Sequence, residues 1–229
     1  MLKMHDSDTI ELKNIDPEDI SDVLLKIETS FGFKFEKDEL KDVKTFGELC
    51  MIIFNKVQGD GINDCTSQQA FYKFRKEISA TLNIETKSIT PDTNMNDLFP
   101  RHIRRQTIAV LDNKLGFKTN LLRPKHWVTL MLIIVLLVSF VGLFLYWQVA
   151  LAGLCFSFIA FKVSSKLANE FDQNSVRQVV YKITRENYLK VRHTPGTLNK
   201  TEIKQIVLDL FSHDLDLDKS VLTNQATFD

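Results

Sequence analysis

The side chains that most often perform chemistry are scattered along this sequence. The cysteines Cys50, Cys65 and Cys155 form no CxxC pair, which predicts free thiols in a reducing compartment. No HExxH, GxSxG, GxGxxG or phosphate-binding loop is present. None of the histidines stands at metal-ligand spacing from a cysteine or a carboxylate; they are His5, His102, His126, His193 and His213. We therefore expect no enzyme activity, no metal and no cofactor.

Two short charged runs resemble ligand sites only in part. Asp214, Asp216 and Asp218 have the spacing that opens a calcium-binding loop. The sixth position is Lys219 instead of glycine and the twelfth is Gln225 instead of glutamate, so no calcium is expected. The basic run RHIRR is too short, and lacks the interleaved aromatic residues, to predict nucleic-acid binding.

Charge is distributed unevenly, and this leaves two candidate partner-binding faces. Residues 1–65 carry 15 acidic and 8 basic side chains, net −7, whereas residues 66–126 carry 5 acidic and 11 basic side chains, net +6. The candidate residues are Asp16, Glu18, Asp19, Asp22, Arg101, Arg104 and Arg105. The basic group has three interpretations, namely a solvated helix face, contact with anionic lipid headgroups, or docking onto an acidic protein.

The longest apolar stretch, Trp127–Phe161, holds 35 consecutive residues without Asp, Glu, Lys, Arg or His. One helix of that length would span about 52 Å, against a membrane hydrocarbon core of about 30 Å. Two helices of about 16–18 residues, turning near Leu145–Gln148, fit better. Basic residues flank both ends, so the positive-inside rule predicts a transmembrane hairpin with both flanks in the cytoplasm. The alternative is a buried hairpin of a soluble protein, which would normally show a polar stripe that is missing here.

The rest of the sequence predicts an all-α fold. Asp16 and Pro17 begin a helix that ends at Gly32, and Thr45 caps a second helix that ends before Gly59. No stretch shows the alternation of a strand. Further helices are expected at about Ser67–Leu82, Arg101–Leu115, Ser175–Tyr188 and Lys200–Ser212.

Internal repeats indicate that one helical module occurs twice. VLLKIETSFGFK from Val23 aligns without gaps on TIAVLDNKLGFK from Thr107, at an offset of 84. TFGELCMIIFNK from Thr45 aligns on SVRQVVYKITRE from Ser175 at 130, and residues 82–96 align on 215–229 at 133. Chance likeness between amphipathic helices is the alternative. The repeats predict that the apolar hairpin is inserted between two helices of the second copy.

With this order of helices and loops, the module resembles the acyl carrier protein, a bundle of helix I, a long loop, helix II, short helix III and helix IV. Residues 16–58, with Lys44-Thr45-Phe46-Gly47-Glu48-Leu49, resemble helices II to IV. Residues 66–116, with the loop Ile89–Phe99, resemble helix I, its loop and helix II, and Ser175–Tyr188 resembles helix IV. The resemblance implies two such bundles, with basic partners docking on the acidic helix II of the first.

Family members carry phosphopantetheine on the serine of an Asp-Ser-Leu motif at the start of helix II. The alignment places Pro17 and Arg101 at that position, and neither can accept the group. Ser21 is the nearest hydroxyl, one helical turn later, and would be the cofactor-binding residue only if the protein were a carrier with a non-standard attachment site. The resemblance therefore implies the carrier fold without the cofactor.

The C-terminal segment, residues 197–229, resembles another helix I with its loop. Its apolar residues are predicted to pack on Val23, Ile27, Leu49 and Ile53, which would complete the first bundle as a permuted carrier fold. The rival pairing places Phe71, Phe74 and Ile78 on the first copy and the C-terminal helix on the second. The short link at Gly59–Cys65 favours the rival, whereas the loop order of the family favours the first pairing.

Together these patterns divide the chain into residues 1–65, 66–126, 127–163 (the hairpin), 164–196 and 197–229. We expect a non-enzymatic protein of the inner (cytoplasmic) membrane with both termini in the cytoplasm. It would act as an adaptor that brings an acyl carrier protein or a lipid-synthesis enzyme to the lipid bilayer. One alternative is a working acyl carrier. The other is a small membrane subunit that packs against a larger enzyme or transporter.

Overall fold

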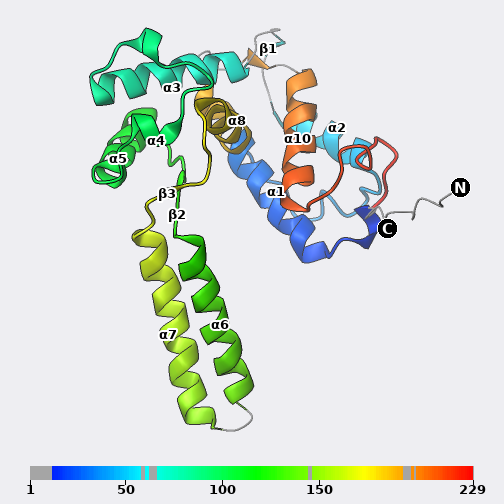
Figure 1. Cartoon of the computed structure of the whole chain (residues 1–229). Coiled ribbons are helices and arrows are strands. Elements are labelled where there is room, and N and C mark those ends of the chain that lie inside the picture. Colours follow the sequence, from blue (N-terminus) through cyan, green and yellow to red (C-terminus); the bar gives the residue numbers. More distant parts are fainter. Residues whose placement is uncertain are drawn as a thin grey trace, which may run out of the picture. The chain divides into compact units, whose positions relative to one another are not determined.

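A computed structural model describes residues 12–57, 60–61, 66–143, 146–192, 197–198 and 200–228 (Figure 1). The described part is mostly helical, as the sequence predicts. The chain forms two compact units, one made of Met1–Lys73 with Val180–Asp229 and the other of Phe74–Val179. Both boundaries lie within helices, α3 (Thr66–Leu82) and α8 (Val176–Glu186).

The first unit begins with the short 3-10 helix η1 (Leu12–Asn14), followed by α1 (Pro17–Phe31) and α2 (Phe46–Lys56). Asp16 caps α1 by accepting a hydrogen bond from the amide of Glu18, and Gly32 ends that helix at a φ of 66°. Thr45 and Glu48 form a complete capping box on α2. The expected starts of both helices are therefore confirmed.

The C-terminal helix α10 (Lys200–Asp214) belongs to the first unit and packs on α1 and α2. One buried cluster combines Val23, Ile27, Leu49 and Ile53 with Ile206 and Leu210. This is the first of the two pairings that the sequence left open. The short helix α9 (Tyr188–Val191) also contacts α1, with the rings of Tyr188 and Phe31 5.1 Å apart. A two-residue parallel pair, β1 (Asp60–Gly61) with β4 (Thr197–Leu198), completes this unit.

The second unit contains η2 (Thr86–Ser88), α4 (Met95–Leu98), α5 (Arg104–Leu115), α6 (His126–Gly142) and α7 (Trp147–Lys166). The antiparallel pair of β2 (Leu122–Arg123) with β3 (Glu170–Phe171) lies where the chain enters and leaves the α6–α7 hairpin. Two predicted boundaries were wrong. Helix α5 begins at Arg104 instead of Arg101, because residues 101–103 form a turn. The helix expected over Ser175–Tyr188 ends at Glu186, and Tyr188 starts α9 after Asn187.

The same backbone contacts occur in both units at the offsets found in the sequence. Thr45 bridges Thr227 in the first unit, and Ser175 bridges Asn94 in the second. Three further hydrogen bonds fasten the loop to the helix start in each unit. In the first unit, each of these bonds runs from an amide to a carbonyl: Phe46 to Ala226, Gly47 to Asn224, and Phe228 to Lys44. In the second unit, the equivalent amide-to-carbonyl bonds are Val176 to Thr93, Arg177 to Pro91, and Met95 to Asn174.

Side-chain contacts and backbone angles repeat as well. The Glu28 carboxylate accepts a hydrogen bond from the amide of Phe35, and Asp112 accepts one from Thr119 at the equivalent place. Ser79 Oγ donates to the carbonyl of Ile84, and Ser212 Oγ donates to that of Leu217. Positive φ angles also match, at Gly32 and Gly116 and at Asn83 and Asp216. The same local contacts therefore occur in both units at the offsets of the sequence repeats.

The α6–α7 hairpin is the main difference between the two copies. In the first copy, the segment between Gly32 and Thr45 is a short link with a turn at residues 37–42. In the second copy, the corresponding segment between Gly116 and Ser175 contains both helices of the hairpin. The hairpin therefore replaces a surface link and leaves the repeated helices and their bridge intact.

Candidate functional site

Among the described residues, no group of histidine, cysteine, aspartate and glutamate side chains could hold a metal ion. His213 Nδ1 lies 2.9 Å from a carboxylate oxygen of Asp214, and Lys26 Nζ lies 3.0 Å from the other oxygen. Burial acts to raise the pKa of Asp214, but the hydrogen bonds from His213 and Lys26 lower it overall. Cys50 is buried, and this burial raises the pKa of its thiol to about 11, so it is not a nucleophile at neutral pH.

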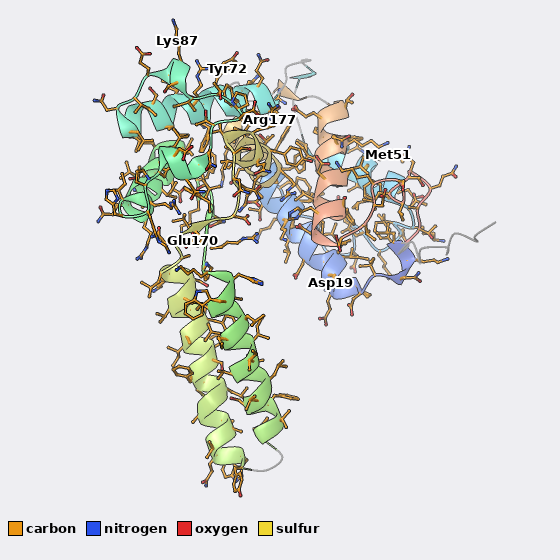
Figure 2. All side chains as sticks on the ribbon, in the orientation of Figure 1. Asp19, Met51, Tyr72, Lys87, Glu170 and Arg177 are labelled. Atoms are coloured by element: carbon orange, nitrogen blue, oxygen red, sulfur yellow. The ribbon has the colours of Figure 1, made fainter. Side chains whose placement is uncertain are left out.

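The predicted acidic face is exposed at the start of α1. Asp16, Glu18, Asp19 and Asp22 are all exposed, and Figure 2 shows Asp19 pointing away from the ribbon at this end of the helix. Asp16 is partly engaged as the helix cap. Four carboxylates within seven residues give this end of α1 a local negative potential available to a basic partner.

The predicted basic face is divided by the structure. Arg104 is only 4% exposed, because its guanidinium points inward and donates to the carbonyls of Phe99 and Asn169 and to Asn96 Oδ1. Its Cζ also lies 4.4 Å from the ring centroid of Phe171, and burial lowers its pKa. Arg104 therefore positions α5 and cannot belong to a docking face, which corrects that part of the expectation.

Arg101 and Arg105 remain exposed beside the hairpin. Arg101 forms an ion pair of 2.6 Å with Glu170 in β3, and Arg105 Nη2 donates to the carbonyl of Lys166 at the end of α7, at 2.8 Å. Asn169 Nδ2 adds a hydrogen bond to the carbonyl of Arg101. These contacts fasten the start of α5 to the point where the chain leaves the hairpin.

The hairpin itself is a large exposed apolar surface. Helix α7 has 20 residues and is long and apolar enough to cross a membrane, whereas α6, with 17 residues, is apolar but shorter. The buried core helix of a soluble protein can have the same composition, but only 11% of the apolar window of α7 is buried. Large side chains on both helices are exposed, among them Trp127, Val138, Val141, Val149, Phe156 and Phe158.

Two cavities in the second unit lie at the foot of this hairpin. The larger, of about 840 Å³, is lined mainly by the start of α5, residues 118–122 and residues 165–169 after and within the end of α7. The smaller, of about 390 Å³, lies along the apolar seam of α6 and α7. No sequence pattern indicates these cavities, because residues far apart in the chain, such as Lys118 and Lys166, form them together.

No family model, curated protein or solved structure matches this chain.

Proposed function

We propose that this protein is a non-enzymatic adaptor held in the inner membrane by the α6–α7 hairpin. The observation that carries the proposal is the exposure of apolar side chains on nearly all sides of two adjacent helices. Contiguous apolar surface of this size is unfavourable in water and marks contact with a membrane or another protein. At 1.5 Å per residue the helices measure about 26 and 30 Å, close to the thickness of a hydrocarbon core.

Packing within the hairpin supports a membrane location. A Cβ atom added at Gly153 of α7 would collide with Ser139 of α6, so the two backbones approach closely there. Ala150 and Ser157 are buried on the same helix as Gly153. Small residues at a helix–helix contact are typical of membrane proteins, in which van der Waals packing replaces the hydrophobic effect.

The two repeated units would be carrier-like modules on the cytoplasmic side. Their order of helix, loop, helix and bridged helix supports the resemblance to acyl carrier proteins. Pro17 begins α1 where the family has its serine, and Ser21 Oγ donates to the carbonyl of Pro17 within the helix. The proposed role is recruitment of an acyl carrier protein or a lipid-synthesis enzyme to the membrane. Asp16, Glu18, Asp19 and Asp22 would form the docking face for a basic partner.

Membrane insertion and topology are tested on the full chain. We expect it to remain in the membrane pellet after alkaline carbonate extraction, and reporter fusions at Met1 and Asp229 to be active only with cytoplasmic reporters. Release into the supernatant would refute insertion. An external reporter signal at either end would refute the hairpin.

The adaptor role is tested by affinity capture from a detergent extract followed by mass spectrometry. We expect lipid-synthesis enzymes, and we expect Asp19→Asn/Asp22→Asn to reduce their recovery. The matched control is Asp38→Asn/Asp42→Asn, which removes the same charge from exposed residues of the same unit. Recovery of transporter subunits, unaffected by either variant, would favour the alternative of a small membrane subunit.

The working-carrier alternative has its own test. After co-expression with a broad phosphopantetheinyl transferase, we expect no increase in intact mass. An increase that maps to Ser21 would establish a carrier.

A further inference from the structure

The larger cavity at the foot of the hairpin is strongly basic. Four cationic side chains line it, namely Arg101, Arg105, Lys118 and Lys166, together with His102. The single carboxylate of the lining, Asp112, is already engaged by the amide and the hydroxyl of Thr119, at 3.1 and 2.6 Å. Within the part of the chain that the structure describes, no carboxylate pairs with Arg105, Lys118 or Lys166. Their charges are therefore available to an anion.

The smaller cavity has the opposite character. Its apolar lining comes from both helices of the hairpin and the residues next to them, namely Pro124, Val128, Leu132, Ala160, Val163 and Leu167. Its polar lining residues lie at the foot of the hairpin; they are Arg101, Lys125, Ser164, Asn169 and Glu170. Arg101 and Asn169 also line the larger cavity, and the carboxylate of Glu170 is paired with Arg101. A basic space and an apolar space thus meet at two common residues.

This arrangement fits an amphipathic anion. An inorganic phosphate would use only the basic cavity, whereas a lipid would use both. The contact between α5 and α7 places Arg105 at the carbonyl of Lys166, where the apolar part of the hairpin ends. At that level a membrane presents its phosphate groups, and basic side chains next to a membrane-spanning segment attract anionic lipids.

We propose that the two cavities bind one anionic phospholipid. Its headgroup phosphate would lie between Arg105, Lys118 and Lys166, and one acyl chain would follow the α6–α7 seam past Val128, Leu132 and Val163. This site rests on the proposed insertion of the hairpin in a membrane. It would also hold α5 at the lipid surface, since the same residues that line the cavity connect α5 to α7.

The test is native mass spectrometry of the full chain in a non-ionic detergent. The protein is mixed with equal amounts of phosphatidylglycerol and phosphatidylcholine that carry the same acyl chains. We expect retained lipid to be mainly phosphatidylglycerol. Because each basic residue near a membrane surface contributes about fivefold to binding, Lys118→Gln/Lys166→Gln should reduce the preference for phosphatidylglycerol by about 25-fold.

The control is Lys76→Gln/Lys87→Gln, which removes the same charge from exposed residues of the same unit. Figure 2 shows Lys87 on the far side of this unit from the hairpin. The control should keep the full preference for phosphatidylglycerol, and circular dichroism should show the same helix content in every variant.

Two results would overturn the lipid site. One is a preference for phosphatidylglycerol over phosphatidylcholine that is the same in the Lys118→Gln/Lys166→Gln variant as in the unaltered protein. The other is loss of bound phosphatidylglycerol on adding excess inorganic phosphate, which would indicate a site for soluble phosphate instead. Carbonate extraction of membranes from the same cells, done before detergent is added, separates the two proposals. A protein that stays in the membrane pellet but shows no lipid preference contradicts only this site.

Discussion

Arg104 offers a sharp test of how the second unit is held together. Of the three arginines predicted to belong to a docking face, it is the one whose side chain is buried, at 4% exposure. Its three hydrogen bonds, of 3.0, 2.8 and 2.8 Å, reach the carbonyl of Phe99, the carbonyl of Asn169 and Asn96 Oδ1. They join α5 to the end of α4 and to the segment that follows the hairpin. Arg104→Met keeps an unbranched apolar stem and removes all three donors.

The expected cost follows from the acceptors that are left behind. Removing one partner of a buried charged network lowers stability by about 3–5 kcal/mol. Each buried acceptor left without a hydrogen-bond donor lowers it by about 1–3 kcal/mol. Asn96 is exposed and Asn169 is half-buried, so water can replace part of the loss. We therefore expect the lower end, about 3 kcal/mol, which corresponds to roughly a hundredfold increase in the opening equilibrium.

Hydrogen exchange with mass spectrometry, on the full chain in detergent, measures this change by region. In Arg104→Met, peptides covering Met95–Leu115 should exchange about a hundred times faster, while those covering Pro17–Lys56 should be unchanged. The matched control is Arg105→Met, whose exposed side chain makes one hydrogen bond and should cost at most about 1 kcal/mol. Equal exchange in the two variants would refute the role assigned to Arg104.

Two further predictions concern stability in urea. Gly116→Ala should lower the free energy of unfolding by about 1–2 kcal/mol through its φ of 80° alone, because a Cβ there meets nothing within 4 Å. Gly32→Ala should lower it at least as much, since its Cβ would also lie 3.1 Å from Leu189. An unchanged free energy of unfolding in Gly116→Ala would contradict the left-handed conformation of Gly116. Burial raises the pKa of Glu186, so its contribution to stability is complete below the unfolded value of about 4.3 and is lost as the pH rises through the folded pKa. Glu186→Gln should therefore be more stable than the unaltered protein at neutral pH, with the gain disappearing at about pH 4; a gain of the same size at both pH values would contradict the burial of its charge.

Local signals in the sequence predicted most helices correctly. Asp16 with Pro17, Thr45 with Glu48, and the glycines at 32 and 116 act on their own neighbours, so their effects can be read without the fold. The start of α5 was misplaced because Arg101 looks like the first residue of a basic helix face. In the structure, Arg104 turns inward to satisfy carbonyls outside its helix, and the residues before it form a turn.

The repeat offsets were also readable from the sequence, and they match the bridges of Thr45 with Thr227 and of Ser175 with Asn94. Duplication of a module preserves spacing within each copy, so equivalent backbone bonds recur at constant offsets. Helix periodicity did not decide which copy the C-terminal helix completes, because its apolar stripe could cover either bundle. The shared core of Ile206 and Leu210 with Ile27 and Ile53 decides it.

The sequence by itself determined the helical class, the caps, the duplication and the long apolar stretch, since each depends on neighbouring residues or on regular spacing. Tertiary structure alone decided that Arg104 is buried and that Arg105, Lys118 and Lys166 surround one cavity. These three cations lie on a helix, on the segment after it and at the end of the hairpin. Their charges act together only because α5 is fastened to α7, and no pattern along the chain records a distance across the fold.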